Sequence, residues 1–239
     1  IRETTNVNNH TFRLAKKAQA EGLVVVDDPV SIMRCTNKVY LNELMRSHGI
    51  NTPKAAIVSK ENPLAVVEKI GYPFILKEPD GAFSKGVKKV QNEQELNELL
   101  KGFFKGSELL IAQEFMPTPF DWRVGVFNGQ PLYVCKYFMA RNHWQIIDWK
   151  KSGKVQEGKA ETYAVDQVPK ALISTAVKAT KLIGNSLYGV DIKEVNKKFY
   201  VIEVNDNPNL DAGIEDKVLK NELYETIMET MMERVKIKQ

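Results

Sequence analysis

Apolar and polar residues alternate along two runs near the C-terminal end of the chain, residues 189–195 and 199–205, with Asn196-Lys197-Lys198 between them. Alternation around such a turn predicts a β-hairpin with one apolar face. If the three turn residues form the loop, the cross-strand pairs are Val195 with Phe199, Ile192 with Ile202, Asp191 with Glu203 and Val190 with Val204.

The other face of this hairpin carries Asp191, Glu203 and Asn205. Two carboxylates directly across a sheet repel each other, so their pairing is costly unless a cation offsets it. Mg²⁺ prefers carboxylate and amide oxygens and usually bridges to substrate phosphates. We therefore predict a magnesium site, with Mn²⁺ as an alternative ion. A solvated face whose acids meet lysines such as Lys193 is the structural alternative.

Helical periodicity and short apolar runs alternate through the rest of the chain. The pattern predicts helices over 9–20, 37–47, 63–71, 93–101, 169–184 and 222–235. It predicts strands over 23–26, 55–58, 72–77, 87–90 and 109–114, and a second hairpin, 121–128 with 131–139, on the turn Asn128-Gly129. This mixture of helices and hairpins indicates an α+β fold, with two lobes.

Bulk composition narrows the class of protein. At 239 residues with 43% hydrophobic and 27% charged residues, the chain suits one large or two modest globular domains. A net charge of +4 is too mild for a nucleic-acid partner, and no apolar run approaches the length of a membrane helix. Cys35 and Cys135 lie far apart, which favours reduced thiols and a cytoplasmic location. The chain begins with Ile1 in a segment typical of the end of a domain, so we expect a preceding N-terminal region.

The segment 79–86, PDGAFSKG, is a glycine-bearing polar loop between two predicted strands. Gly81 and Gly86 allow a close backbone approach to phosphate, and Lys85 adds a positive charge. The spacing excludes a Walker P-loop, and a plain hairpin turn is the structural alternative.

The order of these features resembles the ATP-grasp superfamily, and specifically the RimK-type carboxylate–amine ligases. The features are Lys38 opening a helix, Lys77 ending a strand, the glycine loop, the strand end Gln113-Glu114-Phe115-Met116, Asp121-Trp122-Arg123, and the acidic hairpin. The resemblance implies an ATP-grasp fold with nucleotide bound between two lobes. It implies three regions: 1–35 as the remnant of a preceding domain, 36–112 as the small lobe and 113–239 as the large lobe.

The resemblance also implies a role for each matching residue. Nucleotide contacts fall on Lys38, Lys77, the lid loop with Gly81, Ser84, Lys85 and Gly86, the adenine hinge Gln113, Glu114, Phe115 and Met116, the ribose-binding Asp121, and Asn209 near phosphate. Metal ligands fall on Asp191, Glu203 and Asn205, and Arg123 and Lys136, aligned on facing strands, form a basic pair that steadies an acyl phosphate. The lid loop carries fewer glycines than is usual in the family.

The segment 138–149 departs from the family pattern. Arg141 suits a substrate carboxylate, and His143, Trp144 and Trp149 either line the substrate pocket or pack under a loop. The resemblance implies an ATP- and Mg-dependent, ADP-forming ligase that joins a small-molecule or peptide carboxylate to an amine through an acyl phosphate. A non-catalytic nucleotide-binding module and an ATP-grasp kinase are the alternatives. A homo-oligomer is compatible with this interpretation.

Overall fold

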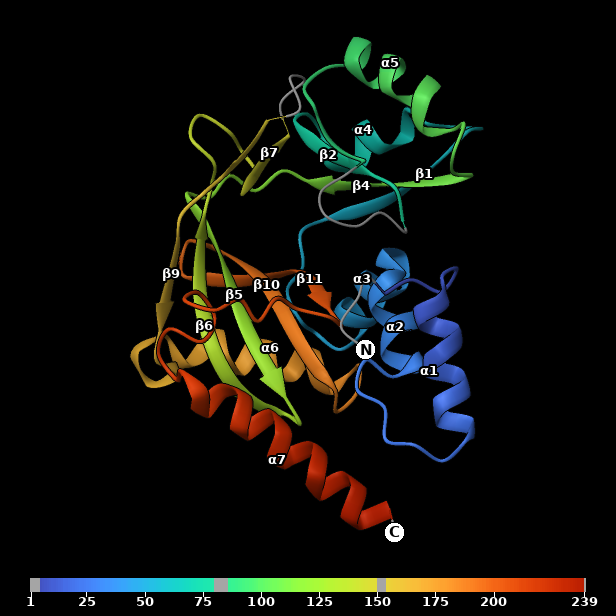
Figure 1. The fold of residues 1–239 in the computed structure, drawn as a ribbon. Helices are drawn as coiled ribbons and strands as arrows, with labels where there is room; N and C mark the ends of the chain where they lie inside the picture. Colours follow the sequence, from blue (N-terminus) through green and yellow to red (C-terminus); the bar gives the residue numbers. More distant parts are fainter. Residues whose placement is uncertain (1–4, 80–85, 150–153, 239) are drawn as a thin grey trace.

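The computed structural model describes residues 5–79, 86–149 and 154–238, which form two lobes, each built on an antiparallel sheet (Figure 1). The sheet of the small lobe has the strand order β1-β4-β2-β3. Its strands are β1 (Ala55–Ser59), β2 (Phe74–Lys77), β3 (Val87–Val90) and β4 (Leu109–Glu114). The predicted α+β class is confirmed.

Helices α4 (Ala65–Ile70) and α5 (Glu93–Phe103) cover one face of the small sheet. Buried side chains of both helices pack against Phe74 and Leu76 of β2. Because successive side chains of a strand point to opposite faces, Lys77 points away from these helices and toward the large lobe. The amphipathic pattern of the helices thus decides where the charged end of β2 lies.

The sheet of the large lobe has the order β11-β10-β5-β6-β9. Its strands are β5 (Phe120–Phe127), β6 (Gln130–Phe138), β9 (Ala160–Tyr163), β10 (Leu187–Val195) and β11 (Lys198–Asn205). The predicted Asn128-Gly129 turn joins β5 to β6, and both residues have positive φ, 52° and 73°. Between β6 and β9 lies a ribbon that the sequence did not predict, formed by β7 (Ile147–Trp149) and β8 (Val155–Glu157).

Two helices pack on opposite faces of the large sheet. Helix α6 (Lys170–Lys181) packs against even-numbered residues of β5 and β10, such as Val124 and Val190. Helix α7 (Asn221–Lys238) packs against odd-numbered residues, Phe127 and Leu187. The second face is apolar only at the end that α7 covers. Farther along the same strands, it becomes polar and carries the candidate site.

The acidic hairpin has a two-residue loop rather than the three-residue loop that we predicted. Val195 pairs with Lys198, and Asn196 and Lys197 both adopt positive φ, 51° and 61°. A bulge beside Ile192 then shifts the register by one residue. The predicted pairs Asp191–Glu203 and Val190–Val204 are therefore confirmed, whereas Val195–Phe199 and Ile192–Ile202 are wrong.

In the N-terminal segment the two predicted helices are confirmed, whereas the predicted strand is absent. It contains α1 (His10–Ala20), α2 (Pro29–Thr36) and α3 (Lys38–Ser47). The apolar run 23–26 forms no strand. The N–H of Leu23 instead donates to the carbonyl of Ala18 at 3.0 Å, and Val26 packs against the core cluster that contains Phe127 and Leu187. Helix α2 was missed, although Asp28 caps it with Pro29 in its first turn.

Helix α3 packs in the core of the large lobe, although the sequence grouped it with the small lobe. Its buried residues Leu41 and Met45 belong to the same core cluster as α6 and the large sheet. The segment after α3 also binds this sheet, since the carbonyl of Asn51 accepts the N–H of Val201 (2.9 Å). No helix in the described residues has the length and apolar character needed to cross a membrane.

Candidate active site

A row of charged side chains crosses three neighbouring strands of the large sheet. Arg123 on β5 lies directly opposite Asp191 on β10, which lies opposite Glu203 on β11. Side chains of directly opposed residues share one face of a sheet, so these three groups meet although they are far apart in the sequence. The cross-strand register thus brings together the acidic residues that the alternation pattern placed on one face.

Arg123 neutralises Asp191 through two parallel hydrogen bonds. Its Nε donates to Oδ1 at 2.7 Å, and its NH2 group donates to Oδ2 at 2.9 Å. Both side chains are 19% exposed. Burial disfavours the charge of Arg123, but the Asp191 carboxylate outweighs that effect and raises the pKa of Arg123 above its usual value. Asn205 donates its Nδ2 to the same carboxylate, at 3.1 Å from Oδ2.

Lys38 supplies the compensating charge for Glu203. The Lys38 Nζ lies 3.3 Å from Oε1 of Glu203. Helix α3 begins at Lys38, with Asn37 as its N-cap. The packing of α3 against the large sheet therefore brings the lysine to the edge strand β11. The cations that meet Asp191 and Glu203, Arg123 and Lys38, thus come from outside the hairpin, whereas Lys193 pairs with Asp121.

Lys193 lies on the same face as Asp191 and binds Asp121. Its Nζ is 2.5 Å from Oδ1 of Asp121 and 2.7 Å from Oγ1 of Thr118. Burial raises the pKa of Asp121, and the Lys193 charge opposes this shift. The pair was missed from the sequence, although the two-residue spacing between Asp191 and Lys193 was a usable signal.

Lys136 does not pair with Arg123, so the expected alignment of these two residues is wrong. Lys136 lies opposite Trp122, whereas Arg123 lies opposite Cys135. The two cations therefore project from opposite faces of the sheet. The Nζ of Lys136 lies among aromatic rings, 4.4 Å from the centroid of Phe120 and 4.7 Å from that of Trp122. Its charge is stabilised there by cation–π contacts.

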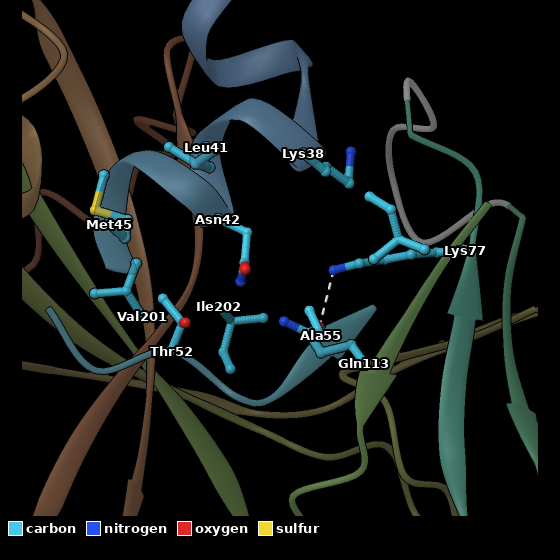
Figure 2. A pocket seen from close by; sticks show the side chains of 11 residues that line it. Lys38, Leu41, Asn42, Met45, Thr52, Ala55, Lys77, Gln113, Val201 and Ile202 are labelled. Carbon is cyan, nitrogen blue, oxygen red and sulfur yellow. Dashed lines mark hydrogen bonds between the residues drawn. The ribbon is translucent and has the colours of Figure 1, made fainter. Parts of the chain in front are cut away.

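A small cavity of about 20 Å³ lies between the two lobes, next to Lys38 (Figure 2). Lys77 points into it and donates from Nζ to Oε1 of Gln113 at 2.9 Å. Burial lowers the pKa of Lys77 to about 8; Glu203 opposes this shift and Lys38 adds to it. The two lysines thus face one region, one from each lobe.

The residues that also line this cavity and were not predicted from the sequence include Asn42, Thr52 and Ile202. The hydroxyl oxygen of Thr52 is buried and has no hydrogen-bond partner among the described residues. Such an atom is costly unless a ligand or water pairs with it. Ile202 is the residue that the hairpin bulge leaves without a cross-strand partner, and it lines the cavity with Val201.

The hinge residues lie where β4 leaves the small lobe. Glu114 closes β4 by accepting the N–H of Lys54 at Oε2 (3.2 Å). Phe115 then lies between the lobes, with the Nζ of Lys89 4.1 Å from its ring centroid and Trp144 edge-on at 5.8 Å. Trp144 belongs to the segment that departs from the family pattern. The predicted hinge and this segment are therefore in direct contact.

Replacing Trp144 by leucine is expected to loosen the hinge. An edge-to-face aromatic pair contributes about 1 kcal/mol, so amide exchange around Phe115 should accelerate by roughly fivefold. Hydrogen exchange followed by mass spectrometry measures this change. Trp149→Leu is the matched control, because Trp149 is 47% exposed on the ribbon, and it should leave the hinge amides unchanged. Equal acceleration in both variants would contradict a specific Trp144–Phe115 contact.

The remaining predicted site residues are not part of the contacts described above. Gly81, Ser84 and Lys85 lie outside the described residues. Gly86 has φ 75°, and a Cβ there would approach Oε2 of Glu78 to 3.1 Å. Arg141 and Asn209 are exposed, and Asn209 donates from Nδ2 to Oδ2 of Asp211 at 3.0 Å. Met116 follows Phe115 in the interlobe connection.

The donor set of Asp191, Glu203 and Asn205 fits a magnesium ion. Two carboxylates and one carboxamide supply hard oxygen atoms, and the remaining positions of a Mg²⁺ shell normally belong to water and phosphate. The described residues contain no cluster of three or more His, Cys, Asp or Glu side chains placed to hold a metal. Two carboxylates and one carboxamide would leave coordination positions for water and for the phosphate oxygens of a substrate. Arg123 and Lys38 currently balance the two negative charges.

The chain is similar to known proteins in sequence and in fold. A family model of the RimK-like ATP-grasp domain matches residues 35–231. The chain is 28% identical over 190 residues to the alpha-aminoadipate–LysW ligase LysX of Sulfurisphaera tokodaii, a match that covers 77% of this chain and 63% of that protein. It is 25% identical over 206 residues to a probable alpha-L-glutamate ligase of Teredinibacter turnerae, covering 84% of this chain and 65% of that protein. The chain thus spans less than two thirds of the length of these two relatives.

The fold also matches a solved structure. The D-alanine–D-alanine ligase of Bacillus anthracis superposes with a TM-score of 0.75 at 19% sequence identity, and the match covers 95% of this chain and 77% of that one. At this identity the likeness concerns the fold. The match includes both lobes, because it covers 95% of this chain.

Proposed function

Because the chain belongs to the RimK-like ATP-grasp family, we propose that it carries the ATP-dependent, ADP-forming centre of a ligase that joins a carboxylate to an amine. The observation that carries this proposal is the cross-strand row Arg123–Asp191–Glu203, which meets Lys38 beside the interlobe cavity. Phosphoryl transfer depends on positioning and charge neutralisation, and this row offers both. Amino acids or peptides are the proposed source of both reacting groups.

The interlobe region is the proposed nucleotide site. Lys38 and Lys77 would neutralise phosphate oxygens, while Gln113 and the unpaired Thr52 hydroxyl offer hydrogen bonds to a base. Asp121, oriented by Lys193, would accept hydrogen bonds from ribose hydroxyls. A cavity of about 20 Å³ has room for little more than a water, so nucleotide entry requires the lobes to move apart or side chains to turn.

Asp191, Glu203 and Asn205 are the proposed holders of Mg²⁺, which when bound would neutralise phosphate charge as a Lewis acid. Asp191 would then exchange part of its pairing with Arg123 for the ion. Arg123 would remain beside the reacting phosphate and stabilise the charge on its oxygens. The same residue thus balances the carboxylate in one state and phosphate in the other.

The proposed reaction has two steps. A substrate carboxylate oxygen attacks the γ-phosphorus of ATP, and ADP leaves with the electrons of the broken P–O bond. The amine nitrogen then attacks the acyl carbon, phosphate leaves, and the nitrogen loses a proton to give an amide. Arg123, Lys38 and Lys77 orient and neutralise the phosphate groups. Acyl phosphates hydrolyse readily, so closure of the two lobes would exclude water.

Turnover by the full-length protein with ATP, Mg²⁺ and a panel of amino acids and short peptides tests the proposal. Release of ADP and phosphate, with a hydroxamate formed when hydroxylamine is added, is the expected result. A phosphorylated product without hydroxamate would identify a kinase instead. Tight nucleotide binding without turnover across the panel would identify a non-catalytic module, and either outcome would overturn the ligase proposal.

ATP affinity is expected to fall above pH 8 because of Lys77. The pKa of Lys77 is about 8 before the nucleotide binds, and phosphate charge beside it should raise that pKa. The complex then binds more protons than the free protein at pH values above 8, so binding is strongest below this pH and weakens as pH rises, by at most about tenfold per unit.

Calorimetry of ATP binding at pH 8.5 in two buffers of different ionisation enthalpy measures the proton uptake. We expect uptake of more than roughly half a proton, from a lysine with a pKa near 8. Lys77→Arg keeps the charge but does not titrate here, so it should remove both the uptake and the pH dependence. Uptake that persists in Lys77→Arg would assign the proton to another group.

A further inference from the structure

The loop 206–220, between β11 and α7, lies on the polar face of the large sheet beside the candidate site. Gly189 makes room for it, because a Cβ at this position would lie 2.7 Å from Cβ of Pro208. Two side chains of the sheet hold the loop backbone. Tyr133 donates its hydroxyl to the carbonyl of Asn209 at 3.1 Å, and Thr162 donates to the carbonyl of Ile214 at 2.6 Å.

Glu215, in this loop, has a fully buried carboxylate. Its exposure is 0%. One oxygen accepts the hydroxyl of Tyr137, and the other accepts the N–H of Asp211 at 2.8 Å. Burying a carboxylate is energetically costly, and a well-packed apolar residue would anchor a loop at less cost. A function that needs the negative charge would explain why a glutamate lies here.

Tyr137 connects this buried carboxylate to Arg123. The guanidinium carbon of Arg123 lies 5.2 Å from the centroid of the Tyr137 ring, within cation–π range. Burial, together with the hydrogen bond to Glu215, raises the pKa of Tyr137, so the phenol keeps its proton and donates it. A phenol that donates to an anion has a more electron-rich ring, which binds a cation more strongly.

The contacts therefore form a continuous chain from Asp191 through Arg123 and Tyr137 to Glu215. Among the described residues, Arg123 contacts the Asp191 carboxylate and the ring of Tyr137. If Asp191 bound a metal ion, the ring of Tyr137 would keep the guanidinium in place. Glu215 contacts two parts of this region. One oxygen binds the Tyr137 hydroxyl, and the other binds the N–H of Asp211, two residues after Asn209.

We propose that Glu215 is a positioning residue of the ligase centre, which acts through Tyr137 to hold the guanidinium of Arg123 and at the same time fixes the loop that carries Asn209. The proposal rests on the proposed function for its effect on turnover. Its effect on Arg123 is independent of that function.

Glu215→Gln and Tyr137→Phe test the proposal through kinetics. Glutamine has nearly the same shape as glutamate, but one of its two terminal atoms is an NH2 donor instead of an oxygen. It therefore cannot accept the Tyr137 hydroxyl on one side and the Asp211 N–H on the other. Phenylalanine keeps the ring and removes the hydroxyl. Because Arg123 acts on charge that develops during phosphoryl transfer, both variants should lower kcat by about 10- to 50-fold and change the KM for ATP by less than about threefold.

Thr162→Val is the matched control. It removes another hydrogen bond between the sheet and the same loop, yet it does not touch Arg123 or Tyr137. Its melting temperature should fall about as much as that of Tyr137→Phe, while kcat stays within about twofold of the wild type. Loss of kcat in Thr162→Val equal to that in Tyr137→Phe would reduce Glu215 to a general loop anchor and overturn the proposal.

Nuclear magnetic resonance of the Arg123 Nε–H gives a readout that needs no turnover. The signal is assigned by its loss in Arg123→Lys, and its hydrogen exchange should accelerate at least about tenfold in Glu215→Gln and Tyr137→Phe but not in Thr162→Val. If the wild type turns nothing over while exchange changes as expected, the proposed function fails and the positioning role stands. Unchanged exchange in both variants would overturn the positioning role, even in an active ligase.

Discussion

Glu203→Gln is expected to lower turnover by about 10²- to 10³-fold while leaving the fold intact. The substitution removes one of the two charges that would hold the metal ion, and the stabilisation of developing phosphate charge is lost with it. The Glu203 carboxylate is 32% exposed and its partner Lys38 lies at 3.3 Å, so the ion pair itself contributes within about 1 kcal/mol to stability. Steady-state ADP release and thermal melting measure the two effects.

Glu194→Gln is the matched control for this loss. Glu194 lies on the same hairpin and accepts the indole N–H of Trp122 at 3.0 Å, a bond that a glutamine oxygen preserves. Turnover of this variant should stay within about twofold of the wild type, because its oxygen lies away from the charged row. If Glu203→Gln kept a third or more of wild-type turnover, the acidic hairpin could not be the metal site.

Arg123→Met is expected to lose both stability and activity. Asp191 would keep its negative charge in a site that is only 19% exposed, directly opposite Glu203. Breaking one side of such a pair costs about 2–4 kcal/mol, because the remaining carboxylate loses its cation. Urea unfolding measures the loss, and ADP release should fall by about 10²-fold or more.

Magnesium provides the diagnostic for this variant. With Arg123 absent, the two opposed carboxylates should bind Mg²⁺ more tightly, so millimolar Mg²⁺ should raise the melting temperature of Arg123→Met more than that of the wild type. Adding Asp191→Asn removes the unpaired charge, and the double variant should recover stability without responding to Mg²⁺. A single variant that ignores Mg²⁺ would contradict the assignment of Asp191 as a ligand.

The alternation pattern of the acidic hairpin predicted its strands but not the details of its register. Alternation predicted the two strands and the opposition of Asp191 and Glu203, and both are present. The loop was wrong by one residue, and a bulge at Ile202 restores the register that the shorter loop would have lost. A bulge of one apolar residue in an apolar run leaves no mark on the pattern, so the sequence could not reveal it.

For Lys136, a bulge that changes the register of a hairpin made the prediction wrong. A bulge between Gly125 and Val126 decides which residue of β6 faces Arg123, and it selects Cys135. One residue of register moves a side chain to the other face of the sheet. A cation expected beside Arg123 therefore lies among aromatic rings on the α6 side. Helix α2 is a different case. Its N-cap Asp28 and the following Pro29 are a sequence signal for a helix start, but the pair was interpreted only as the end of a strand.

The sequence by itself determined what depends on neighbours along the chain: the alternation of the hairpin, the periodicity of the helices, and the residue types that suit phosphate and magnesium. Only the tertiary structure decided which charges meet. Lys38 reaches Glu203 because α3 packs on the large sheet, and Glu215 reaches Tyr137 because a loop crosses Gly189. These contacts join residues more than 70 positions apart, and their formation depends on strand register and core packing, which no single segment encodes.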